Sequence, residues 1–227
     1  MKFHFWKTLL WVIKLTYHNI RYKLFIDSWV TITIASLITV FMFIPNGYEI
    51  FYFQPQKILE QHQYWRIITA PLVHSSWDHF TWNMIVMLAS SLVSEKLNRR
   101  LYLTYLFAVV ISTSLFKLLT QDIDQISSGF SNIASGSFVL LLMLIAFEGL
   151  KDKDFWLALV PAILLVMFVS HELNFLWGET TAWQAMSGRN LGGAPTKQLK
   201  IGHIVGIITG ALVASSYFFT TLIKQQR

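Results

Sequence analysis

The 227-residue sequence contains no cysteine and few charged residues. The absence of cysteine excludes a disulfide framework, a thiolate metal site and a cysteine nucleophile. Asp, Glu, Lys and Arg together make up only 13% of the chain, whereas 54% of the residues are hydrophobic and the mean hydropathy is +0.50. This composition excludes a soluble globular domain.

The charges that are present leave long gaps. Six runs of at least sixteen residues carry no charge and cover about half of the chain: 28–48, 79–94, 101–116, 125–147, 155–171 and 201–223. A spanning helix takes roughly 20 apolar residues, and runs somewhat shorter suffice where the bilayer is thin. We therefore expect an all-α membrane protein, with a compact six-transmembrane helical bundle forming one domain over 25–227.

The segment 1–24 precedes the first of these runs and is basic. Lys7, Lys14 and Arg21 recur every seven residues and so lie on nearly one stripe of a helix, with aromatic and aliphatic residues around much of the remainder. This pattern is typical of an amphipathic helix on an anionic membrane surface. We predict that this segment contacts membrane lipids, and we expect no nucleic acid partner.

The distribution of Lys and Arg also predicts the orientation. Twelve of the 18 flank the runs on the side that holds both chain ends, and five lie on the opposite side. The positive-inside rule then predicts that both termini are cytoplasmic. With six spans, the second, fourth and sixth all begin at the outer surface.

Polar residues occur at those three outer ends. They are His79 and Asn83 in the second run, Ser131 in the fourth and His203 in the sixth. A serine hydroxyl is a weak nucleophile until a neighbouring base, most often histidine, takes its proton. Ser131 and His203 are therefore candidate nucleophile and base, while His79, Asn83 and backbone N–H groups at a helix N-terminus are candidate donors to an oxyanion.

Several glycine residues lie close in sequence to these candidate residues. Gly129 lies two positions before Ser131 and permits a tight entry into the helix. Gly202, Gly206 and Gly210 recur every four residues, and Gly136 adds a small residue to the fourth run. Small residues at this spacing let two membrane helices approach closely, which is what bringing His203 to Ser131 requires.

The ordered combination of these motifs resembles the rhomboid intramembrane serine proteases over about residues 57–215. The matching features are Trp65-Arg66, His74 followed by His79 and Asn83, Glu95, Gly129-Phe130-Ser131, and Gly202-His203 with Gly206 and Gly210. The resemblance implies a rhomboid-type helical bundle and a dyad of Ser131 and His203 without a third acidic member. It also implies that His79 and Asn83 line an oxyanion hole, and it implies no cofactor or metal.

Two positions depart from the family pattern. Asn132 stands where the family usually has glycine, and Ser135 where it commonly has an aromatic residue. Asn132 could crowd the substrate, or its amide could donate to the oxyanion or the substrate backbone. Ser135 would leave His203 without a stacking partner. A catalytically inactive rhomboid-like protein that binds transmembrane clients is therefore an alternative.

Gly136, five positions after Ser131, is similar to a glycine of the rhombosortase branch of the family. That branch is associated with trimming C-terminal Gly-Gly tail anchors from exported proteins of Gram-negative bacteria. The resemblance thus implies a transmembrane or tail-anchored protein substrate. It also implies a location in the bacterial inner membrane, with the active site facing the periplasm.

The sequence also bears on other classes of membrane protein. The His171-Glu172 pair is not followed by the second histidine of a metalloprotease motif. Every Asp and Glu lies outside the six runs, which disfavours an aspartyl protease. A small transporter remains an alternative, although the run centres lack the ionisable residues expected there. The stretch 172–200 is predicted to be an outer loop, and we hypothesise that it gates the site.

Overall fold

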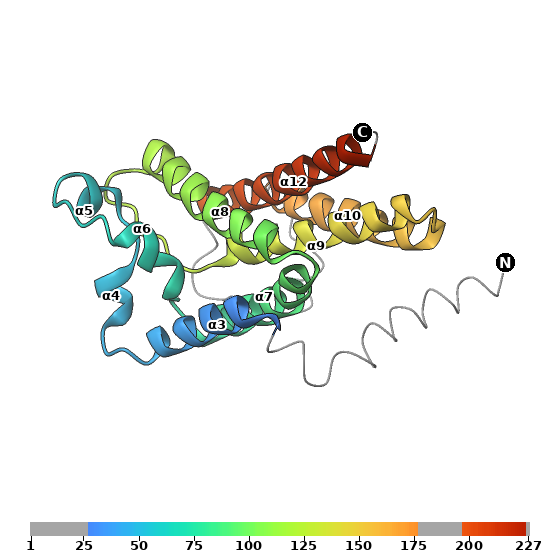
Figure 1. Cartoon of the computed structure of the whole chain (residues 1–227). Coiled ribbons are helices and arrows are strands. Elements are labelled where there is room, and N and C mark those ends of the chain that lie inside the picture. Colours follow the sequence, from blue (N-terminus) through green and yellow to red (C-terminus); the bar gives the residue numbers. More distant parts are fainter. Residues whose placement is uncertain (1–26, 177–196, 226–227) are drawn as a thin grey trace.

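The computed structural model describes residues 27–176 and 197–225 of the chain. The predicted amphipathic segment 1–24 lies outside these residues. Within them the fold is all-helical apart from an isolated bridge between Phe53 and Ser127. The helices are α3 (Trp29–Met42), α4 (Gly47–Phe51), α5 (Pro55–Leu59), α6 (Arg66–Thr69), η1 (Ala70–Leu72), α7 (Trp77–Leu97), α8 (Arg99–Thr120), α9 (Ser131–Lys151), α10 (Phe155–Leu176) and α12 (Lys197–Gln225) (Figure 1).

Four of these helices, α8, α9, α10 and α12, are long and apolar enough to cross a membrane. They correspond to the last four uncharged runs. The first run forms α3, which has only 14 residues, and the second forms α7, which includes Asp78, Glu95 and Lys96. The all-helical class is confirmed, whereas the count of six spans stays a prediction.

Two boundaries differ from those expected. The run 125–147 does not become helical until Ser131, because its first residues are extended and pair with Phe53. The boundaries predicted for the loop 172–200 are wrong at both ends, since α10 continues to Leu176 and α12 begins at Lys197. At both ends of this stretch a charged residue lies inside the helix, so the uncharged run is shorter than the helix. Residues 177–196, and the gate hypothesis with them, lie outside the described residues.

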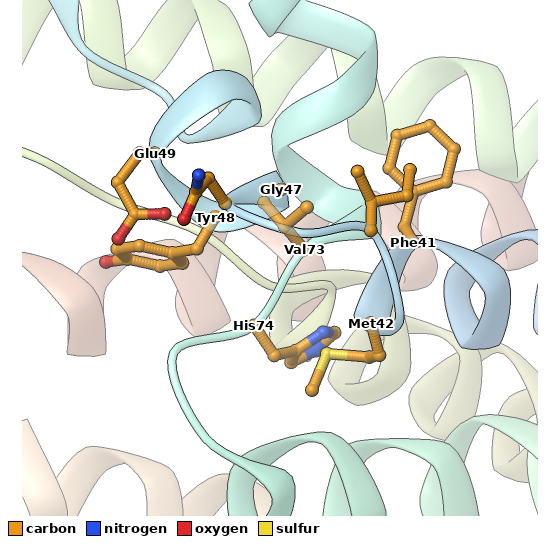
Figure 2. A pocket seen from close by; sticks show the side chains of 9 residues that line it. Phe41, Met42, Gly47, Tyr48, Glu49, Val73 and His74 are labelled. Carbon is orange, nitrogen blue, oxygen red and sulfur yellow. The ribbon is translucent and has the colours of Figure 1, made fainter.

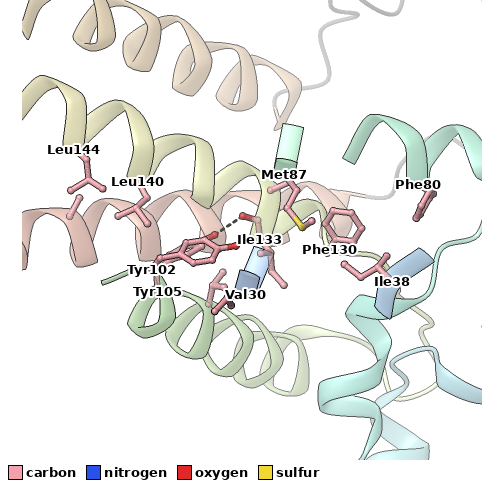
Figure 3. Close-up of a cluster of buried hydrophobic side chains, with 13 residues drawn as sticks. Val30, Ile38, Phe80, Met87, Tyr102, Tyr105, Phe130, Ile133, Leu140 and Leu144 are labelled. Carbon is pink, nitrogen blue, oxygen red and sulfur yellow. Dashed lines mark hydrogen bonds between the residues drawn. The ribbon is translucent and has the colours of Figure 1, made fainter. Parts of the chain in front are cut away.

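The central helix is α9, which packs against α7, α8, α10 and α12 and is the most buried of the four long helices. Its inner residues join a hydrophobic cluster with α3, α7 and α8, part of which Figure 3 shows. Within the cluster, the hydroxyl of Tyr105 on α8 donates a hydrogen bond of 2.6 Å to the carbonyl oxygen of Ile133. This bond ties the first turn of α9 to α8.

Helices α7, α9 and α12 run parallel to one another. Between α12 and α9, Gly206 contacts Asn132 and Gly210 contacts Gly136, so residue numbers rise together along the two helices. The same holds for α7, where His79 contacts Gly129 just before α9 and Ser91 contacts Ser137 within it. The intervening helix α10 returns in the opposite direction, since Gly149 near the end of α9 contacts Ala158 near the start of α10. The three parallel helices therefore begin at the same end of the bundle.

The backbones of α9 and α12 touch where glycines face each other. A Cβ on Gly206 would overlap the carbonyl oxygen of Asn132, and one on Gly136 would overlap that of Gly206. The predicted close approach is confirmed at these positions and at Gly210. Gly202 is different, because a Cβ there would meet no atom within 4 Å. The glycine contact therefore begins one turn later than the sequence spacing indicated.

The segment that leads into α9 is held by the short helices before α7. Phe53 and Ser127 exchange backbone hydrogen bonds of 2.8 and 2.9 Å, and the N–H of Gly129 donates to the carbonyl oxygen of Ala70 at 3.1 Å. Arg66, which is 4% exposed, supports this region by donating from Nη1 to the carbonyl oxygen of Tyr52 at 2.7 Å. Together these bonds position the entry to α9.

Helix α3 is attached to α7 by a buried carboxylate. Glu95, near the end of α7, is 1% exposed and accepts the backbone N–H groups of Val30 and Thr31 at 3.1 and 2.8 Å. Arg99 donates to the same carboxylate at 3.2 Å. Negative charge at a helix N-terminus satisfies N–H groups that have no partner within the helix.

The contact between α9 and α12 leads to a test of stability. The Gly206→Ala variant should melt several degrees below wild type in detergent, because the added methyl group would force the two backbones apart. The Gly202→Ala variant adds the same group where the structure has space, so its melting temperature should stay within about a degree of wild type. Equal melting of the two variants would contradict the contact.

Candidate active site

Ser131 is the first residue of α9 and is half-buried. The first hydrogen bond of this helix runs from the N–H of Ala134 to the carbonyl oxygen of Phe130 at 2.9 Å. The N–H groups of Ser131, Asn132 and Ile133 therefore have no acceptor within the helix, and they carry its positive end. Among the described residues, the Ser131 hydroxyl makes no hydrogen bond.

Gly129 brings α7 and the loop before it against this helix end. Its φ of +89° is one that side-chain-bearing residues rarely adopt, and a Cβ there would lie 3.2 Å from both His74 and His79. Glycine is thus needed both for the turn and for the close approach of two imidazole rings. The predicted tight entry is confirmed.

His79 and Asn83 lie one turn apart on α7. The N-terminus of this helix is capped by Ser76, whose hydroxyl accepts from the N–H of His79 at 3.2 Å. The Nδ2 atom of Asn83 is buried and has no hydrogen-bond partner among the described residues. A buried amide donor without a partner is costly, and an acceptor that entered the site would satisfy it.

His203 lies on the first described turns of α12. His203 lies three residues before Gly206, and Gly206 touches Asn132. Helix α12 therefore places His203 near Ser131 at the start of α9. Its ring is also close enough to His79 to interact electrostatically. The Nδ1 atom of His203 is 3.0 Å from Oε2 of Glu172. No hydrogen bond joins His203 to Ser131 within the described part of the chain.

The contact with Glu172 was not predicted from the sequence. The family resemblance implied no acidic partner, and the residue was assigned to a loop because it ends an uncharged run. In the structure it lies on α10 and is 9% exposed. One signal could have revealed it, because Glu172 ends the fifth run at the surface where the other polar candidates gather.

The two departures from the family pattern have different surroundings. Asn132 is buried and donates from Nδ2 to the hydroxyl of Thr113 on α8 at 2.8 Å. Its amide therefore joins two helices, and the expectation that it donates to an oxyanion is not supported by this contact. Ser135 is 7% exposed and provides no ring that could stack on His203.

His74 is a third histidine beside the site and lines a pocket of about 180 Å³ (Figure 2). It is 4% exposed, and neither ring nitrogen has a partner among the described residues. Its ring packs edge to face against Phe130 and Phe80, with centroids 4.7 and 5.7 Å apart. Burial, with a smaller effect of His79, lowers the pKa of His74 to about 3.

The site does not resemble a metal centre in the part of the chain that the structure describes. No group of three or more His, Asp or Glu side chains there is close enough to hold a metal ion. His74 and His79 face each other with ring centroids 5.2 Å apart, in a T-shaped arrangement that suits packing.

The fold and the site together define a helical membrane protein with serine and histidine at neighbouring helix ends. The Rhomboid domain model matches residues 61–219, which is more than half of the chain. The chain therefore belongs to the rhomboid family, and it is an integral membrane protein that is an intramembrane protease or a relative of one. No curated protein and no solved structure that was compared with the chain matches it.

The buried state of His74 predicts how stability depends on pH. The folded pKa is about 3 and the ordinary value is 6.5, so only the unfolded chain binds the proton between these values. Stability should be complete above pH 6.5 and fall with decreasing pH, by up to about 1.4 kcal/mol per unit. Thermal melting of wild type and His74→Phe between pH 7.5 and 4.5 measures this, and the variant should show the shallower slope. Parallel slopes would contradict the assignment.

Proposed function

We propose that the chain is an active intramembrane serine protease, with Ser131 as the nucleophile and His203 as the general base. The observation that carries the proposal is the backbone contact between Gly206 and Asn132, which brings the first turns of α12 and α9 together. The Nδ1 atom of His203 is bonded to Glu172, which leaves Nε2 as the acceptor for a serine proton.

In the proposed reaction the oxygen of Ser131 attacks the carbonyl carbon of a peptide bond while its proton passes to Nε2 of His203. The carbonyl oxygen takes the displaced electron pair and becomes an oxyanion. As the tetrahedral intermediate collapses, the C–N bond breaks and His203 gives its proton to the leaving amine. Water then attacks the ester by the same route, which releases the acid and restores Ser131.

The oxyanion would be held by donors that the structure leaves without partners. They are the N–H groups at the start of α9 and Nδ2 of Asn83, with His79 beside them. Donors fixed in place before the reaction stabilise developing charge without reorganising, which makes this kind of stabilisation a large part of catalysis.

In the membrane, we propose that α3 and α7 complete a bundle of six spans, with both termini cytoplasmic and the site facing the outer side. Several large apolar side chains on or next to the short helices before α7 are exposed, including Ile50, Leu59, Trp65 and Ile68. Such residues favour contact with the lipid interface. The substrate would be a transmembrane protein that presents an unwound segment to Ser131.

A narrower proposal is that the enzyme trims C-terminal Gly-Gly tail anchors, as rhombosortases are associated with doing. Gly136 supports the likeness in sequence, although it also has a packing reason, because a Cβ there would overlap the backbone of Gly206. A tail-anchored substrate with Gly-Gly at the cleavage site, compared with one carrying Ala-Ala, tests this part separately.

The alternative is an inactive relative that binds transmembrane clients. It is favoured by the absence of a hydrogen bond between Ser131 and His203 in the described residues, and by Asn132 in place of glycine. A fluorophosphonate probe separates the two functions, because it labels serine only where a base activates the hydroxyl. Labelling of Ser131 supports the protease, and folded but unlabelled protein supports the client-binding function.

The dyad predicts that Ser131→Ala and His203→Ala each abolish cleavage of a tail-anchored substrate and leave melting nearly unchanged. The double variant should be no worse than either single one, because nucleophile and base act as a unit. Ser216→Ala, which changes an exposed serine on α12, is the matched control and should cleave normally. Substantial activity of His203→Ala would contradict the assignment.

The oxyanion hole predicts that Asn83→Ala lowers kcat by about 100-fold to 1,000-fold with little change in KM. Its stability should not fall, because the amide that is removed has no partner in the described structure. Thr81→Ala, an exposed position on the same helix, is the control. A raised KM with unchanged kcat would make Asn83 a substrate-docking residue instead.

A further inference from the structure

We infer that Glu172 is a positioning residue for His203, so that the base is oriented by a carboxylate on α10. This inference rests on the proposed function of Ser131 and His203. It adds a third member to a site for which the family resemblance implied two. Glu172 touches neither Ser131 nor the bond that breaks, and it acts only through the imidazole ring.

The contact has the geometry of an orienting hydrogen bond. The Oε2 atom of Glu172 is 3.0 Å from Nδ1 of His203, and the side chains are 11% and 26% exposed. The other oxygen, Oε1, lies 3.9 Å from Nδ1 of His171, whose side chain is 48% exposed. The closer and better shielded partner of this carboxylate is therefore the proposed base.

The carboxylate determines which ring nitrogen carries the proton. A carboxylate only accepts hydrogen bonds, so the neutral ring must donate from Nδ1 and keep its lone pair on Nε2. That tautomer can take a proton from a serine hydroxyl. When the ring has taken the proton, the nearby negative charge stabilises the imidazolium, as in serine, histidine and acid triads.

The sequence explains why this chain needs such a partner. Ser135 occupies the position where the family commonly has an aromatic residue, and a serine cannot hold the ring by stacking. The ring of His203 is partly exposed and lies on the first turns of its helix, so packing alone restrains it weakly. A charged hydrogen bond supplies the orientation that the missing ring would give.

The bundle keeps the carboxylate in place. Near its start, α10 touches α9 so closely that a Cβ on Gly149 would overlap the backbone of Ala158. Farther along, Phe138 and Phe168 pack with ring centroids 5.0 Å apart. Because α10 is fixed against α9 at two levels, its end carries Glu172 to the His203 side of the site.

The test compares Glu172→Gln, Glu172→Asp and the neighbouring control His171→Gln. Glutamine keeps the shape and removes the charge, and its amide can favour the wrong tautomer, so kcat should fall by about 100-fold with KM unchanged. The rate of Ser131 labelling by a fluorophosphonate should fall in proportion, since that reaction needs no substrate binding. Glu172→Asp should recover part of both rates, and His171→Gln should match wild type.

Melting temperatures separate positioning from folding. Glu172→Gln should melt close to wild type, so that unfolding does not account for its lower rates of cleavage and labelling. Wild-type rates in Glu172→Gln would overturn the inference while leaving the dyad intact. A loss of labelling in Glu172→Gln that comes with a melting temperature several degrees below wild type, and that Glu172→Asp does not recover, would also overturn it. If wild type itself neither cleaves nor labels, the proposed function fails first.

Discussion

The site depends on the direct contact between the backbones of α9 and α12. Gly206 lies on Asn132, and Gly136 lies on Gly206, with no side chain between the two backbones at these positions. A histidine one turn before that contact can approach a serine at the first position of α9 only if the axes are this close. The hydroxyl, the imidazole and the helix-end N–H groups are therefore brought to one end of the bundle by residues that have no role in the proposed reaction.

Much of the site could be predicted because polar residues are conspicuous in apolar helices. His79, Asn83, Ser131 and His203 stood out for this reason, and parallel helix directions place them at one end of the bundle. Glu172 did not stand out, because a charged residue at the end of an uncharged run is typical of the end of a membrane helix. A helix ends where its last carbonyl groups are capped and the chain turns away, and a single acidic residue near the surface is compatible with another helical turn.

The partner of Asn132 could not have been predicted either. Its amide reaches Thr113, and that pairing depends on how α8 is rotated about its axis. The sequence of a helix that is apolar on all sides says little about how the helix is rotated about its axis, since lipid and protein interiors accept the same side chains. Hydrogen bonds between neighbouring helices are therefore where the structure adds most to the sequence.

The bond between Glu95 and the start of α3 also bears on how the protein is made. Helix α3 is synthesised before α7, and the carboxylate that accepts the N–H groups of Val30 and Thr31 follows about 65 residues later. Until α7 is complete, the beginning of α3 lacks this acceptor, and a short helix of 14 residues has little apolar length to hold it in lipid. Helix α3 is therefore fixed in place by a helix that is made after it, the long helix α7.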